Sequence, residues 1–218
     1  MKNLIIIAAR KNSKRLRNKN LTKIGKKNLI QRSIEFALKI SDKTYVYLST
    51  DSEKIKSYSK KYNIICPALR PKFLSSSKAS SSDVCIHAIK NFIKITNNTV
   101  SNVILLQPTS PFRTVAYYKK TYNIFKKNKK PTITVSPIQD KKFIQTSKNK
   151  IKFLKDEKKN FYEINGNLYI IKVSDLIKTK SFFKKDFNIS ITKSKKLSVD
   201  IDTIYDLDIA KKFVQWNY

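Results

Sequence analysis

Glycine, cysteine and histidine are scarce in this chain of 218 residues. The two glycines, Gly25 and Gly166, lie too far apart for a Walker A loop, which needs two glycines within one short phosphate-binding turn. The two cysteines, Cys66 and Cys85, make neither a disulfide framework nor a zinc site, so we expect a reducing, cytoplasmic location. The single histidine, His87, gives no support to a Ser-His-Asp mechanism.

Long apolar runs are also missing. No stretch of about 18 apolar residues occurs, which argues against a transmembrane helix. The apolar run after Asn3 ends at Ala9, which is too short for the apolar region of a secretory signal. We therefore expect no membrane partner.

Acidic residues are few, at 15 against 47 lysines and arginines, and the formal net charge is +32. Such a charge suggests a nucleic-acid-binding protein, which is one alternative function. However, only six of the basic residues are arginine, and the lysines are spread along the whole chain instead of forming one stripe. We interpret the charge as a compositional bias of the surface. It predicts salt-sensitive adhesion to polyanions but no specific nucleic-acid partner.

Strand and helix patterns alternate through the first two-thirds of the chain, which predicts an α/β fold with a mostly parallel sheet flanked by helices. The expected strands are residues 4–9, 44–49, 63–66, 102–107, 132–136 and 167–172. The expected helices are residues 29–38, 52–61, 82–95, 114–127 and 204–214. β-type runs between residues 131 and 154 predict an extension of the sheet and a small β arm, roughly residues 137–166. We expect one domain over residues 1–218.

A basic loop follows the first expected strand directly, from Arg10 to Asn20. In an open α/β sheet, ligands bind just beyond the carboxyl ends of the strands. Arg10 and Lys19 offer cations to a nucleoside triphosphate, and Asn12 and Ser13 offer hydrogen bonds. An asparagine here also tolerates a left-handed backbone conformation in place of glycine. The alternative is a solvated run of charges at a turn.

Two carboxylates stand two residues apart in the segment Val199-Asp200-Ile201-Asp202-Thr203. If residues 197–203 form a strand, Asp200 and Asp202 point to the same side, where a cation must offset their repulsion. Carboxylate oxygens beside phosphates indicate Mg²⁺. The alternative is that Asp202 or Thr203 merely caps the following helix.

Polar groups without charge follow the strand at residues 102–107. The strand ends in Gln107, and Pro108 and Pro111 fix the chain beyond it. Gln107, Thr109 and Ser110 suit a sugar or ribose, although the segment could be only a rigid turn. Two further segments suit a base or ribose or could be ordinary loops and turns: Arg70-Pro71 with Ala79-Ser80-Ser81-Ser82, and Asn165-Gly166-Asn167.

Taken together, these segments resemble the acylneuraminate cytidylyltransferases, also called CMP-sialic acid synthetases. The resemblance spans nearly the whole chain and depends on six motifs in order. They are Ala9-Arg10-Lys11-Asn12-Ser13-Lys14 with Lys19-Asn20, Leu48-Ser49-Thr50-Asp51, Leu69-Arg70-Pro71 with Ala79-Ser80-Ser81, Leu105-Leu106-Gln107-Pro108-Thr109-Ser110-Pro111, Asn165-Gly166 with Tyr169-Ile170, and Ser198-Val199-Asp200-Ile201-Asp202-Thr203.

The resemblance implies a Rossmann-like domain that forms a homodimer through its β arm. It also implies transfer of CMP from CTP to the anomeric hydroxyl of a nine-carbon 2-keto sugar acid, with Mg²⁺ as cofactor. By position, the implied catalytic residues are Arg10, Lys19, Asp200 and Asp202, and the two aspartates hold the metal. The implied nucleotide-binding residues add Ser13, Asn20, Arg70 and Ser81, and the implied sugar-acid residues are Gln107 and Asn165.

This chain departs from the family pattern in two places. Lys11-Asn12 and Arg17 stand where the family often has paired glycines and a proline. Glu163-Ile164 stands where the family often has Arg-Pro, which suggests a different sugar acid, such as legionaminic acid, or a compensating lysine. A cytidylyltransferase for the eight-carbon acid KDO is the closest alternative enzyme.

Overall fold

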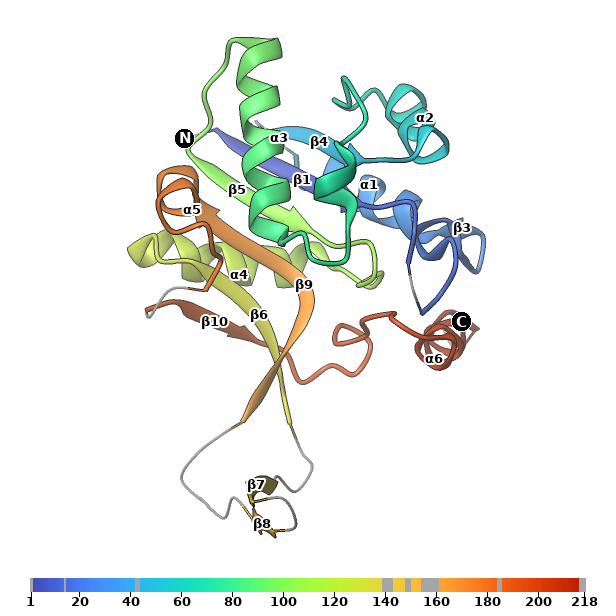
Figure 1. The fold of residues 1–218 in the computed structure, drawn as a ribbon, viewed down its shortest axis with the longest axis vertical. Helices are drawn as coiled ribbons and strands as arrows, with labels where there is room; N and C mark the ends of the chain where they lie inside the picture. The colour runs from blue at the N-terminus through green and yellow to red at the C-terminus, as the bar shows by residue number, and fades with distance from the viewer. Residues whose placement is uncertain are drawn as a thin grey trace.

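The computed structural model describes residues 2–13, 15–41, 44–138, 143–147, 150–153, 161–183 and 186–215. Six strands form a central sheet in the order β10-β6-β9-β5-β1-β4 (Figure 1). Their bounds are β1 Asn3–Ala9, β4 Thr44–Thr50, β5 Asn102–Leu106, β6 Thr132–Pro137, β9 Tyr162–Lys172 and β10 Asn188–Ile191. β1 pairs in parallel with β4 and β5, and β10 with β6, whereas β9 runs antiparallel to β5 and β6. The expected α/β fold with a mostly parallel sheet is confirmed.

Helices cover both faces of this sheet, which explains why its central strands are apolar throughout. Along β1, Ile5 and Ile7 join the core cluster on one face, and Leu4 and Ile6 join the cluster on the other. The first face is covered by α1 (Leu29–Lys39), α2 (Glu53–Tyr62) and α4 (Val115–Asn128). The second is covered by α3 (Ser81–Thr96) and α5 (Val173–Thr179). The sheet is therefore sandwiched between two helical layers (Figure 1).

A third, smaller core attaches the last helix, α6 (Ile204–Gln215), to the rest of the domain. Ile201 and Leu207 pack there with Phe112 and with Ile24, which lies in the short hairpin of β2 (Lys23–Ile24) and β3 (Lys27–Asn28). This packing fixes the segment before α6 against the end of the sheet where β1 and β5 finish.

β9 carries a bulge that shapes this end of the sheet. Ile133 of β6 pairs with Tyr169, but Val135 pairs with Ile164, so the strand gains extra residues between the two pairs. The Thr134 hydroxyl fills the gap in the ladder by accepting from the Leu168 backbone N–H at 2.9 Å. A turn before a strand was one alternative for residues 165–167. They lie instead inside a longer strand, whose bulge turns them out of the ladder.

Several expected elements differ from the structure. The strand expected at residues 197–203 is wrong, although all of its residues are described. The strand expected at residues 63–66 reduces to one bridge between Ile65 and Tyr47. β2, β3, β10 and α5 were not expected. These elements are short, and a short element repeats its hydrophobic pattern too few times to be recognised. In α5, for example, the buried residue is Leu176.

The predicted β arm contains β7 (Phe143–Ser147) and β8 (Lys150–Phe153), which pair antiparallel in a sheet of their own. Residues 139–142, 148–149 and 154–160 of that range lie outside the described residues. The use of the arm in dimerisation stays a prediction. Among the described residues, no helix has both the length and the apolar character that crossing a membrane requires.

Candidate active site

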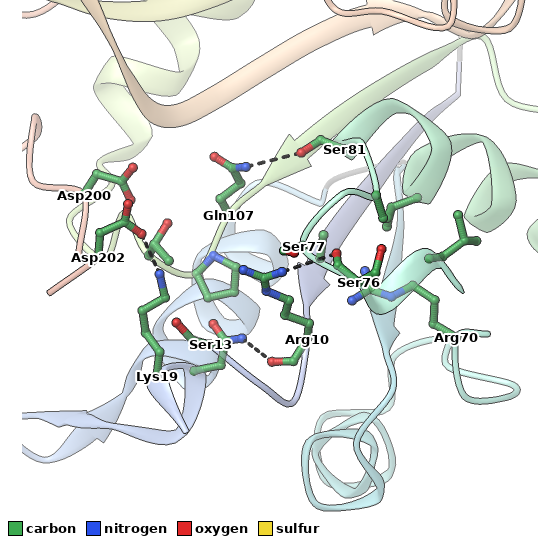
Figure 2. Close-up of a pocket in the computed structure, with 17 residues that line it drawn as sticks. Arg10, Ser13, Lys19, Arg70, Ser76, Ser77, Ser81, Gln107, Asp200 and Asp202 are labelled. Carbon is green, nitrogen blue, oxygen red and sulfur yellow. Dashed lines mark hydrogen bonds and ion pairs between the residues drawn. The ribbon is translucent and has the colours of Figure 1, made fainter. Parts of the chain in front are cut away.

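A cavity of about 350 Å³ opens at the carboxyl ends of β1 and β5 (Figure 2). It is lined by the loop after β1, the turn after β5, the start of α3 with the preceding segment, and the segment before α6. Ten of the predicted site residues meet there: Arg10, Ser13, Lys19, Asn20, Arg70, Ser81, Gln107, Thr109, Asp200 and Asp202. Parts of the chain from residue 10 to residue 202 thus converge on one space.

Hydrogen bonds within the basic loop and to neighbouring segments fix its position. Asn20 donates from its amide to the Arg10 carbonyl at 2.8 Å, and the Lys11 backbone N–H donates to Asp51 Oδ1 at 2.7 Å. The Arg10 guanidinium reaches across the cavity to the Ser76 carbonyl at 3.3 Å. Asn12 is exposed and lines no described part of the cavity. The left-handed asparagine of this loop is Asn18, with φ 54°, rather than Asn12.

Asp202 lies between two cations of this loop. Lys19 Nζ lies 2.7 Å from Asp202 Oδ1, and Arg15 pairs with the other carboxylate oxygen. The Lys19 side chain is only 11% exposed, so this cation is held at the cavity wall and not in free solvent. The pair joins the loop after β1 to the segment before α6.

Asp200 is more deeply buried, and its Oδ1 has no hydrogen-bond partner among the described residues. Burial raises the pKa of this carboxyl and nearby Asp202 raises it further, while a hydrogen bond to Thr109 and the charges of Lys19 and Arg113 oppose the shift. A buried carboxylate oxygen without a donor is costly unless a cation or proton binds it. Asp200 is therefore free to bind a positive ligand at the wall of the cavity.

The two aspartates are brought together without a strand. The Ile201 backbone N–H donates to the Thr109 carbonyl at 2.8 Å, which holds this segment against the turn after β5. The helix cap is formed by Thr203 and Asp206: Asp206 Oδ2 accepts from the Thr203 N–H at 2.7 Å, and Thr203 Oγ1 accepts from the Asp206 N–H at 3.3 Å. Thr203, and not Asp202, therefore caps the helix. The Asp202 side chain points into the cavity instead.

Gly166 permits the closest approach in the site. Its φ is +67°, and a Cβ there would lie 2.9 Å from Ser110 Oγ, 3.0 Å from Gln107 Oε1 and 3.4 Å from Asp200 Oδ2. Ser110 is buried behind the cavity and donates to the Asn165 carbonyl at 3.1 Å. A residue with a side chain would be strained in this conformation and would push these groups apart.

The opposite wall carries Arg70 and Ser81. Arg70 is 7% exposed, and its Nε donates to Ser75 Oγ at 3.2 Å while Nη2 lies 3.9 Å from Asp51 Oδ1. Burial lowers the pKa of this guanidinium. Ser81 opens α3 and accepts from the Gln107 amide at 3.5 Å. The positive end of the α3 dipole therefore adds to the cations of the cavity.

A second cavity, of about 420 Å³, meets the first at Asp200. Its walls are Glu163, Ile164, Asn165, Lys195, Ser198, Val199, Asp200, Asp206 and Ile209. Asn165, predicted to contact the sugar acid, lines this cavity and donates from its amide to Ser136 Oγ at 3.0 Å. The predicted residues thus divide between two adjoining spaces, with Asp200 common to both.

Sequence reasoning missed Arg113, which lies partly buried behind the turn after β5. Its Nε donates to the Asn167 carbonyl at 2.7 Å and its Nη2 donates to the Gln107 carbonyl at 2.6 Å. Burial lowers the pKa of this guanidinium to about 9. The sequence did offer a signal, because arginine is scarce in this chain and most of its cations are lysines. An arginine that follows a strand and two prolines therefore stands out.

Comparisons with solved structures support the fold. A CMP:2-keto-3-deoxy-manno-octonic acid synthetase, solved with CTP, superposes with a TM-score of 0.73 over 100% of both chains at 15% identity. A 4-diphosphocytidyl-2C-methyl-D-erythritol synthase from Anaerococcus prevotii superposes with a TM-score of 0.66 over 98% of both chains at 14% identity. At these identities the likeness shows the fold alone.

Sequence comparisons define the family. A CMP-N,N'-diacetyllegionaminic acid synthase from Legionella pneumophila is 32% identical over 100% of this chain and 98% of the relative. A pseudaminic acid cytidylyltransferase from Campylobacter jejuni is 32% identical with the same coverage. An N-acylneuraminate cytidylyltransferase from Escherichia coli is 30% identical over 95% of this chain, which spans 51% of that protein. The family model for cytidylyltransferases matches residues 4–218, and the chain belongs to this family.

Proposed function

We propose that this chain transfers CMP from CTP to the anomeric hydroxyl of a nonulosonic, sialic-type acid and releases pyrophosphate. The observation that carries the proposal is the pair of adjoining cavities that share Asp200. Group transfer between two substrates needs two spaces that meet where the bond forms. Two relatives that this chain matches over nearly their whole length are named for diacetyllegionaminic and pseudaminic acids. Their names support an acceptor of this class.

The first cavity suits the nucleotide. Arg10, Lys19 and Arg70 face it and can offset the charge of a triphosphate, including the charge that develops on pyrophosphate as it leaves. The backbone at the start of α3 adds a partial positive charge. Ser81 and Gln107 supply neutral hydrogen-bonding groups for the cytidine and the sugar.

Mg²⁺ is the proposed cofactor, and the donor set fits it. Asp200 and Asp202 supply carboxylate oxygens at one wall, and the unpartnered Oδ1 of Asp200 lacks a positive neighbour in hydrogen-bonding range. Among the described residues no cluster of three or more His, Cys, Asp or Glu side chains surrounds a metal-sized space, so the ion would rely on two carboxylates, waters and phosphate oxygens. When bound, Mg²⁺ offsets charge on the triphosphate.

The reaction is an in-line displacement at the α-phosphorus. A bond forms between the acceptor's anomeric oxygen and the α-phosphorus, and the bond to the oxygen that bridges to the β-phosphate breaks. Asp200 lines both cavities and is therefore the candidate acceptor of the hydroxyl proton.

A coupled assay of pyrophosphate release tests the proposal. We expect release only when CTP, Mg²⁺ and a nonulosonic acid are all present, and the CMP-linked acid should be the second product. An Asp200→Asn, Asp202→Asn double variant with an unchanged circular dichroism spectrum should lose turnover. No release with sialic, legionaminic or pseudaminic acid would refute the proposal, and turnover with KDO alone would favour the eight-carbon alternative.

A cytoplasmic homodimer belongs to the same proposal. The antiparallel pair β7–β8 forms a sheet separate from the six-stranded sheet, as a dimerisation arm requires. Light scattering after size-exclusion chromatography should give the mass of two chains. Removal of residues 139–160 and closure of the gap with a short linker should give the mass of one.

A further inference from the structure

The second cavity carries an unusual charge pattern for a space that is proposed to bind an acid. Three carboxylates line it, those of Glu163, Asp200 and Asp206, and the single cation among its lining residues is Lys195. The carboxylate of an acceptor would be repelled by most of this wall. Only the part of the cavity beside Lys195 favours that group.

The three carboxylates are not equivalent. Asp206 is engaged in the α6 cap, where its Oδ2 accepts three hydrogen bonds, from the N–H groups of Asp202 and Thr203 and from the Thr203 hydroxyl. Asp200 belongs to the site of transfer. Glu163 is exposed, and although its backbone pairs with Ser136 in the sheet, no hydrogen bond or ion pair joins its carboxylate to another described residue. Its oxygens are therefore available to accept hydrogen bonds from a ligand.

Apolar side chains lie on both sides of these polar groups. Ile164 on β9 is 47% exposed and Ile209 on α6 is 37% exposed, and both line the cavity together with Val199. Large apolar side chains that remain exposed in a polar cavity gain burial when a ligand places methyl groups on them. A ligand that places hydroxyl groups there would lose hydrogen bonds to water without replacement.

We propose that Lys195 binds the carboxylate of the acceptor and that Glu163, Ile164 and Ile209 select acids with acylamino and methyl substituents. The amide N–H groups donate to Glu163, and the methyl groups pack on the isoleucines. Polyhydroxylated acids and acids without nitrogen are disfavoured. This inference rests on the proposed function and specifies its acceptor.

Replacement of the lysine tests the first half. Lys195→Met should raise KM for the acceptor about tenfold or more, leave KM for CTP unchanged, and change kcat little, because it removes a charge–charge contact to one substrate. Lys193→Met is the matched control, since this neighbouring lysine is exposed and lines neither cavity. Equal effects of the two variants, or a change in KM for CTP alone, would overturn the assignment.

An acceptor panel tests the second half. The wild-type chain should use an N,N'-diacetylated nonulosonic acid with a kcat/KM about tenfold or more above that for N-acetylneuraminic acid, and further above that for KDO. Ile164→Ser and Glu163→Ala should each narrow this ratio. Ile177→Ser is the control, because Ile177 is also 47% exposed but lies on α5, outside both cavities.

The outcomes separate the two proposals. If no acid supports pyrophosphate release, the proposed function itself fails. If all nonulosonic acids react with similar kcat/KM, or if the variants leave the ratio unchanged, the function stands and this inference is wrong.

Discussion

The two glycines of this chain provide a matched pair of substitutions that tests how the site is held together. Both have left-handed backbones, with φ +61° at Gly25 and +67° at Gly166. In both, an added Cβ would meet its nearest atom at 2.9 Å. At Gly25 that atom is Cγ1 of Val214, whereas Gly166 meets Ser110 Oγ and then Gln107 Oε1. The two substitutions therefore share a backbone cost and differ in what they displace.

The magnitudes follow from these contacts. A left-handed alanine costs about 1 kcal/mol in either place. At Gly166, displaced Ser110 and Gln107 side chains add about 1 kcal/mol each, so Gly166→Ala should lower the free energy of unfolding by about 3 kcal/mol. For a chain of this length that corresponds to a melting temperature lower by about 6–12 °C. Gly25→Ala should lose about half as much or less, because the Val214 side chain is only partly buried and can shift.

The effects on activity should differ far more. Gly166→Ala moves Gln107 and crowds Asp200, and misplacement of groups at a site of transfer by about 1 Å costs about 100-fold in rate. Gly25→Ala should keep kcat/KM within about twofold, since Gly25 lines no described part of the cavity. Pyrophosphate release measured below both melting temperatures decides the matter. Near wild-type kcat/KM for Gly166→Ala would refute the argument that this glycine sets the geometry.

Three further predictions concern charge. Burial raises the pKa of Asp200, so its stabilising protonated form is fully present below the unfolded pKa and is lost as pH rises through the folded pKa. Asp200→Asn should therefore raise the melting temperature of the metal-free protein at pH 7 but not at pH 3, while abolishing turnover; a lower value at pH 7 would contradict this. Arg113→Met should lower kcat/KM and the melting temperature, because it removes one donor from each of the Asn167 and Gln107 carbonyls, whereas Arg113→Lys should recover only part of both activity and stability in the same assays. Binding to random-sequence DNA should fall steeply between 50 and 200 mM salt, as fluorescence anisotropy would show; sequence-dependent binding that survives would revive the nucleic-acid alternative.

The sequence predicted the parts of the fold whose pattern has one physical solution. Leu4 to Ile7 are apolar at every position, which only a strand covered on both faces explains, and the basic loop follows directly. Helix α1 was also clear, since its apolar residues recur at helical spacing. In contrast, β10 is an edge strand of only four residues, and its alternation of polar and apolar residues is too short to predict a strand without its pairing to β6.

In the site, too, local sequence predicted some features and missed those that depend on distant contacts. The alternating residues Val-Asp-Ile-Asp predicted a strand that puts both aspartates on one side. The strand is wrong, but both aspartates do line the same cavity. The hydrogen bond from the Ile201 N–H to the Thr109 carbonyl, the burial of Ile201 and the ion pair between Asp202 and Lys19 hold the two carboxylates at the cavity instead. The role of Gly166 depends on a bulge in β9, which arises from pairing with β6, so local sequence could not reveal it.

The ion pairs of Asp202 have a consequence for the order in which ligands bind. In the chain without ligands, Lys19 and Arg15 already neutralise this carboxylate. A free divalent ion that binds Asp202 would have to displace Lys19 and Arg15 and would leave both without an anionic partner. A metal–nucleotide complex also brings phosphate groups. These can form ion pairs with Lys19 and Arg15 while the metal binds the Asp202 carboxylate. We therefore expect metal and CTP to bind as one unit, and calorimetry with Mg²⁺ alone should give little heat.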